Sequence, residues 1–176
     1  AWWLWPGGDG ASPRLLDPAA LAAALPADGG DGFATLDTSV DWTPELPQDL
    51  GPHPAFRTEL WDLTGQLRDD AGRRYGLRLT LVRLGLRAPR EDGGRASGLA
   101  ADGLLLGRFA LVPEDGEPLS AERASRTAAG LAGATAHPPE VWLEDWRLRL
   151  GSADGMGDAA GGRLAVAADG ARLELT

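Results

Sequence analysis

The sequence predicts an all-β domain made of short antiparallel strands. Apolar and polar residues alternate with a period of two in several segments, which is the pattern of a half-buried strand. Turn signals built from Gly, Asp and Pro separate these segments, and no long helical pattern interrupts them. About six such strands are typical of a sandwich or a barrel, and a barrel would also close the edges of its own sheet.

Composition narrows the functional classes. The 176 residues suffice for one domain with a core. The net charge of -9 and the pI near 4.6 argue against a nucleic-acid partner, because no basic stripe is present to neutralise phosphates. Without cysteine, and with His53 and His137 as the two histidines, we expect neither a disulfide nor a metal site. No cofactor is expected either.

The chain divides into a leader at 1–46 and a domain at 47–176. A short helix is expected between Asp17 and Pro26, because Asp is a good N-cap and Pro stops a helix. Residues 27–54 are rich in Gly, Asp and Pro and are expected to lie extended on the domain surface.

A hairpin follows the leader. From Phe56 the alternation places Glu59 and Trp61 on one face of the first strand. The sequence DDAG at 69–72 predicts a turn, and a second strand then runs to about Leu84.

Three further strands are predicted besides the segment at 141–150. A third strand is expected at 104–112, and two short strands at 163–167 and 171–176. Residues 120–131 mix helix-favouring side chains with glycine breaks and receive no assignment.

The segment at 141–150, VWLEDWRLRL, gives the strongest strand signal in the chain. It is predicted to form one strand, with Trp142, Glu144 and Trp146 on the same face.

Several blocks carry a family resemblance. Residues 47–61 read PQDLGPHPAFRTELW, and later blocks read GRRYGLRLTLVR, ERASRTAAGLAGA and VWLEDW. Together they resemble the N-terminal lipocalin-like module of the carotenoid 1,2-hydratase and AttH family, bacterial proteins described as predicted secreted hydrolases, over about residues 47–150. The resemblance implies a lipocalin-like antiparallel β-barrel and a second lipocalin-like module after it. The resemblance does not decide whether this barrel is complete by itself or needs the second module to close.

The chain departs from the family pattern at a few positions. Leu60 and Asp62 stand where the family usually has Trp and Tyr, and Leu50 and Arg108 stand where it usually has His. These departures favour a binding role over the chemistry of the family.

The resemblance therefore implies two functions. The first is a binding domain for an apolar or amphipathic small molecule, such as a carotenoid or a lipid, associated with the permease and ATPase of an ABC transport system. The second is a carotenoid 1,2-hydratase, a hydro-lyase that adds water to a terminal double bond by carboxylate acid catalysis. The apolar start AWWLW is compatible with the trimmed end of an anchor or export segment, so we expect an extracytoplasmic location.

Glu59 and Glu144 are the candidate catalytic residues. Each shares a predicted strand face with tryptophans, and a carboxyl group that loses solvent keeps its proton more readily, as acid catalysis requires. The alternative is that each is ion-paired with arginine and fixes the packing of the strands. The candidate members of such structural ion pairs are Arg83, Glu122, Arg123, Arg126 and Asp145.

The candidate ligand contacts are His53, Arg57, Trp61, Trp142 and Trp146. His53 stands between two prolines that fix its backbone, so it could contact a ligand or anchor the leader to the barrel. The tryptophans could line an apolar pocket or simply fill the core.

Overall fold

The computed structural model describes residues 32–37, 39, 41, 43, 45–46, 48–89, 101–151, 162–168 and 171–175. The helix expected between Asp17 and Pro26, and the apolar start of the chain, lie outside these residues. Within the described part of the chain, no helix has the length and apolar character of a membrane span.

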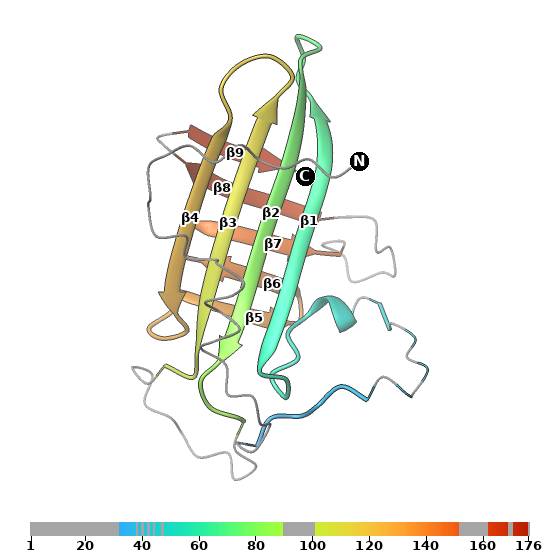
Figure 1. Ribbon diagram of the computed structural model, residues 1–176, viewed down its shortest axis with the longest axis vertical. Helices are drawn as coiled ribbons and strands as arrows, with labels where there is room; N and C mark the ends of the chain where they lie inside the picture. The colour runs from blue at the N-terminus through green and yellow to red at the C-terminus, as the bar shows by residue number, and fades with distance from the viewer. Residues whose placement is uncertain are drawn as a thin grey trace.

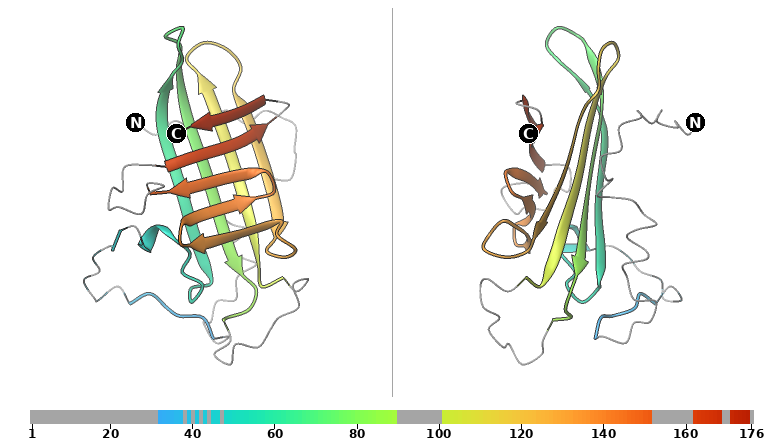
Figure 2. Two further views of the ribbon diagram at one scale, coloured as in Figure 1. Left: turned by 180° about the vertical axis from the view of Figure 1, so that it is seen from behind. Right: turned by 60° about the vertical axis from the view of Figure 1, so that its left-hand side comes forward.

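The described strands form two antiparallel sheets that face each other, with their strands running crosswise (Figures 1 and 2). The long sheet contains, in spatial order, β1 (Thr58–Arg68), β2 (Arg74–Gly85), β3 (Gly103–Pro113) and β4 (Leu119–Arg126). The short sheet contains β5 (Ala132–Ala136), β6 (Pro139–Leu143), β7 (Trp146–Leu150), β8 (Gly162–Ala168) and β9 (Ala171–Leu175). One 3₁₀ turn, η1 (Gln48–Leu50), precedes β1.

The all-β prediction is confirmed. The described residues contain no α-helix, and their two sheets do not close into one barrel, which is consistent with an incomplete lipocalin-like fold. No described strand pairs with the outer edge of β1, so the long sheet ends there with an open edge.

The predicted first hairpin is also confirmed. Trp61 lies opposite Leu81 in the β1–β2 register, so that both side chains point to the short sheet. In the turn, a carboxylate oxygen of Asp69 accepts hydrogen bonds from the backbone N–H groups of Ala71 and Arg73 at 3.0 and 2.9 Å. These bonds fold the turn that the sequence DDAG predicts.

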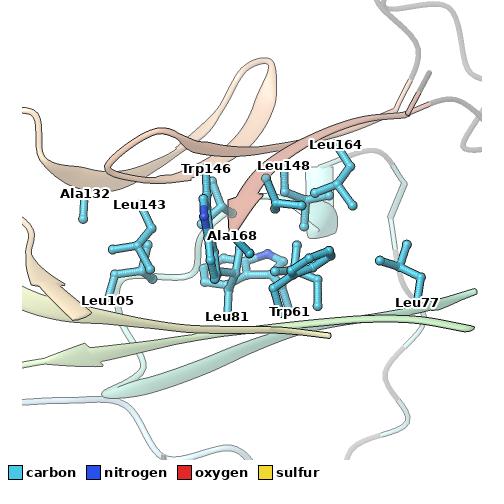
Figure 3. Close-up of a cluster of buried hydrophobic side chains, with 14 residues drawn as sticks. Trp61, Leu77, Leu81, Leu105, Ala132, Leu143, Trp146, Leu148, Leu164 and Ala168 are labelled. Carbon is cyan, nitrogen blue, oxygen red and sulfur yellow. The ribbon is translucent and has the colours of Figure 1, made fainter. Parts of the chain in front are cut away.

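The core lies between the two sheets (Figure 3). Its largest fully buried side chains are Trp146, Phe109, Leu79, Leu81, Leu105, Leu143, Val141 and Val166. The Phe109 and Trp146 rings meet edge to face, with their centroids 6.2 Å apart. Gly107 lets the side chains of Leu143 and Trp146 pack directly on β3, because a Cβ at this position would lie 2.6 Å from Leu143 and 2.9 Å from Trp146.

The prediction of a single strand at 141–150 is wrong. Glu144 and Asp145 form a tight turn between β6 and β7, and Glu144 has a positive φ of 56°. The turn shifts the alternation, so that Leu143 and Trp146 both face the core. Trp142 therefore lies on the outer face of the short sheet and not beside Trp146.

The unassigned segment at 120–131 contains β4 and a corner that leads into the short sheet. Ala129 and Gly130 both have positive φ, at 52° and 73°, which turns the chain sharply. The third strand and the two C-terminal strands appear where they were predicted.

Candidate ligand-binding pocket

An open pocket of about 390 Å³ lies beside the free edge of β1. Its apolar wall is formed by Trp61 and Leu63 from β1 and by Leu148 and Leu150 from β7. The segment that precedes β1, residues 48–57, covers one side of the pocket, and we call it the approach segment. The remaining lining residues are Asp49, Leu50, Gly51, His53, Glu59, Leu60 and Asp62.

Hydrogen bonds tie the approach segment to β1. The indole N–H of Trp61 donates to the carbonyl of Leu50 at 3.2 Å. The backbone N–H of His53 donates to Glu59 Oε1 at 2.6 Å, and the His53 ring Nδ1 lies 2.8 Å from the same oxygen. Two side chains of β1 therefore hold the segment over the pocket.

Glu59 and Arg83 form a largely buried ion pair below His53. They are direct cross-strand neighbours in the β1–β2 register, and Arg83 Nε donates to Glu59 Oε2 at 3.0 Å. The two side chains are only 11% and 13% exposed. Arg83 Nη2 also donates to the carbonyls of His53 at 3.0 Å and Phe56 at 2.7 Å. This network satisfies the polar groups that the approach segment brings against the sheet.

His53 is held between two carboxylates. Its Nδ1 contacts Glu59, and its Nε2 lies 3.4 Å from Asp49 Oδ1. Partial burial of the ring opposes protonation, but the contacts with Glu59 and Asp49 outweigh it and raise the pKa of His53 above its ordinary value.

This raised pKa predicts a pH dependence of stability. Because the folded state favours protonated His53, the stabilisation is fully present below the ordinary histidine pKa of about 6.5 and is lost as the pH rises through the folded-state pKa. The free energy of unfolding lost in His53→Asn should therefore be larger at pH 5.5 than at pH 8.5, as measured by urea denaturation. In 1 M NaCl the difference should shrink, since the ring is partly exposed. A larger loss at pH 8.5 would contradict the assignment.

Glu144 lies in a separate cluster, at the β6–β7 turn. Arg123 Nη1 is 2.8 Å from Glu144 and 2.5 Å from Asp145, and the Arg123 guanidinium lies 5.2 Å from the centre of the Trp146 ring. Arg123 Nη2 donates to the carbonyl of Ala167 at 3.4 Å. The contacts of Arg123 therefore link β4 with the β6–β7 turn and with β8, and none of these residues lines the pocket.

The other candidate residues are dispersed. Trp142 covers Gly133 on the outer face of the short sheet and donates to the carbonyl of Gly130 at 3.1 Å. The guanidinium of Arg57 lies 4.5 Å from the centre of the Phe33 ring. On β4, Glu122 lies 3.5 Å from Arg108 on the outer face of the long sheet, and Arg126 is exposed at the end of the strand.

Sequence reasoning named His53, Glu59 and Trp61 as site residues and missed the other eight residues of the pocket lining. Leu63, Leu148 and Leu150 belong to alternating strands, so their inward direction was readable, but which strand ends meet across the two sheets was not. Asp49 had a weak signal, since it lies four residues before His53. Within the described residues, no group of three or more His, Cys, Asp or Glu side chains could hold a metal ion.

Two comparisons with known proteins identify relatives. A family model described as AttH-like matches residues 38–176. The chain is similar to the crystal structure of a Nitrosomonas europaea protein described as a candidate AttH, with a TM-score of 0.59 and 27% sequence identity. The match covers 81% of this chain and 39% of that protein, so the chain spans well under half of its length. No curated protein matches the chain.

Proposed function

Since this chain belongs to the AttH-like family, we propose that it is a binding domain for an apolar or amphipathic small molecule, held in the pocket beside β1. The observation that supports the proposal is the composition of the pocket. Four apolar side chains from two sheets form one wall, and a few fixed polar groups stand at the other side. This combination is typical of small-molecule sites, where apolar surface gives affinity and polar groups orient the ligand.

The contacts of Glu59 favour binding over catalysis. As a general acid it would have to deliver a proton to the ligand from one of its oxygens. Both oxygens already accept hydrogen bonds, from Arg83 on one side and from His53 on the other. Glu144, the second candidate acid, does not line the pocket.

Carotenoid 1,2-hydratase activity is the alternative, because Glu59 and Trp61 stand side by side in the pocket lining. A tryptophan face could stabilise the cation that forms when a double bond is protonated. Incubation of the protein with lycopene or neurosporene, followed by product analysis, decides between the two. Hydroxylated product that disappears in Glu59→Gln would replace the binding proposal.

We also propose a wider role: this chain lies outside the cytoplasm and is the binding component of an ABC transport system with a permease and an ATPase. It rests on the family resemblance. Fractionation of cells and co-purification with the permease would test it, and recovery of the protein in the cytoplasm alone would contradict it.

Ligand binding should depend on the apolar wall. Leu150→Gln is expected to weaken binding of a neutral apolar fluorophore, N-phenyl-1-naphthylamine, by about tenfold, because the burial of a leucine side chain contributes about 1.5–3 kcal/mol. The matched control is Leu131→Gln, since Leu131 is 45% exposed and does not line the pocket. Equal affinity in Leu150→Gln and wild type would place the ligand elsewhere.

A further inference from the structure

We propose that the pocket selects ligands whose polar end is an amine or a hydroxyl group and discriminates against ligands that end in a carboxylate or phosphate. This inference rests on the proposed binding function and specifies its substrate class. It follows from which charges line the pocket and from which of them are already neutralised inside the protein.

The pocket places its apolar and polar parts at different depths. Trp61 and Leu148 are 8% and 3% exposed, so the apolar wall reaches into the space between the sheets. The side chains of Asp49 and His53 are 21% and 39% exposed and stand nearer the solvent. An amphipathic ligand would bury its chain against the wall and leave its polar end among the rim groups.

Carboxylates dominate the polar part. Asp49 and Glu59 present their carboxylates to the pocket, whereas the third acidic lining residue, Asp62, directs its carboxylate to Arg78 on the outer face of the long sheet. The described lining residues include no arginine or lysine. Arg83 lies next to the pocket, but its guanidinium donates its hydrogen bonds to Glu59 and to the carbonyls of His53 and Phe56. A ligand anion would therefore meet no guanidinium, and the ring of His53 is already held between the carboxylates of Asp49 and Glu59.

The three carboxylates are not equally available. Glu59 is paired with Arg83, and Asp62 accepts from Arg78 at 3.1 and 3.2 Å and from Thr80 at 2.7 Å. The negative charge of Asp49 has the weakest hydrogen-bond partners of the three.

Asp49 Oδ2 accepts from the backbone N–H of Glu45 at 2.6 Å, while Oδ1 has only the 3.4 Å contact with the His53 ring among the described residues. That distance is beyond the usual range for a strong N–H···O bond. Asp49 Oδ1 can accept a further donor, and an ammonium or hydroxyl group supplies one.

The experiment compares three probes with the same chain: dodecylamine, dodecanol and dodecanoate, each below its micellar concentration and at low salt. Each displaces N-phenyl-1-naphthylamine from the wild-type protein, from Asp49→Asn and from Glu114→Gln. The last variant removes the same charge at the far end of the long sheet, where Glu114 pairs with Arg74.

We expect the amine and the alcohol to bind at least about threefold more tightly than dodecanoate, the scale of a partly exposed charge interaction. Asp49→Asn should lower the ratio of amine to carboxylate affinity by about threefold, and Glu114→Gln should leave it unchanged. Wild-type protein that binds dodecanoate as tightly as the amine overturns the inference. An equal loss of the preference for the amine in Asp49→Asn and Glu114→Gln also overturns it, because the preference would then arise from the net charge of the protein.

The inference and the binding proposal fail in different ways. If all three probes bind equally and Leu150→Gln weakens all of them, the pocket binds ligands but the selectivity is absent. If folded wild-type protein binds none of them, both proposals fall. Should Asp49→Asn fail to fold, the order of the three probes on the wild-type protein still decides the question.

Discussion

Replacing Arg83 with methionine should lower the free energy of unfolding by about 3–5 kcal/mol, the cost of removing one partner of a buried ion pair. The change leaves the carboxylate of Glu59 without its guanidinium in a largely buried position. It also deprives the carbonyls of His53 and Phe56 of a donor. Urea denaturation followed by tryptophan fluorescence measures the loss.

Arg78→Met is the matched control for Arg83→Met. Arg78 lies on the same strand and also pairs with a carboxylate of β1, Asp62, but its side chain is 65% exposed and points to the outer face. Its loss should cost at most about 1 kcal/mol. A double-mutant cycle with Glu59→Gln should show strong coupling for Arg83. Similar losses in the two arginine variants would mean that the Glu59–Arg83 pair does not anchor the approach segment.

Trp146→Ala should destabilise the protein by about 3–5 kcal/mol, as expected for truncation of a large buried aromatic side chain. Trp146 is 1% exposed, and its indole N–H donates to the carbonyl of Ala167 at 2.9 Å. Its removal would leave a cavity between the sheets beside Phe109 and Gly107, and the carbonyl of Ala167 would keep only the longer contact with Arg123 at 3.4 Å among the side-chain donors of the described residues. Thermal and urea unfolding both report the loss.

The control for Trp146→Ala is Trp142→Ala, four residues earlier in the same hairpin. Trp142 lies on the outer face, covers Gly133 and contacts the guanidinium of Arg147, 5.8 Å from its ring. Its truncation should cost about 1 kcal/mol, because it removes one hydrogen bond and a partly exposed contact. Equal costs for the two tryptophans would contradict the turn at Glu144.

The β1–β2 hairpin was predictable because two local signals agree there. Alternation fixes the inward face from Trp61 onward, and Asp69 and Gly72 supply the chemistry of the turn. At 141–150 the same two signals disagree. The sequence continues to alternate through Glu144 and Asp145, no Gly or Pro accompanies Asp145 as a turn signal, and Arg123 holds the turn from another strand. That contact is tertiary, so a local pattern could not disclose it.

The candidate site was predictable only in part, for a related reason. The sequence placed Glu59 beside Trp61 and named several arginines as partners of the glutamates. It could not select Arg83, because that pairing depends on the register that the turn imposes. The meeting of Asp49 with His53, and of Leu148 and Leu150 with β1, depends on how separate segments pack.

The order of the strands has a consequence for how the chain folds. In each sheet every strand pairs with its immediate successor in the sequence, from β1 to β4 and from β5 to β9. Paired strands are therefore neighbours along the chain, and the entropic cost of closing each hairpin is smallest where the connection is short, as between β1 and β2 or between β6 and β7. Such a low contact order favours fast folding for a β protein, with two meanders that form one hairpin at a time. Their docking across the core joins the two halves of the chain, and it is the step we expect to limit the rate.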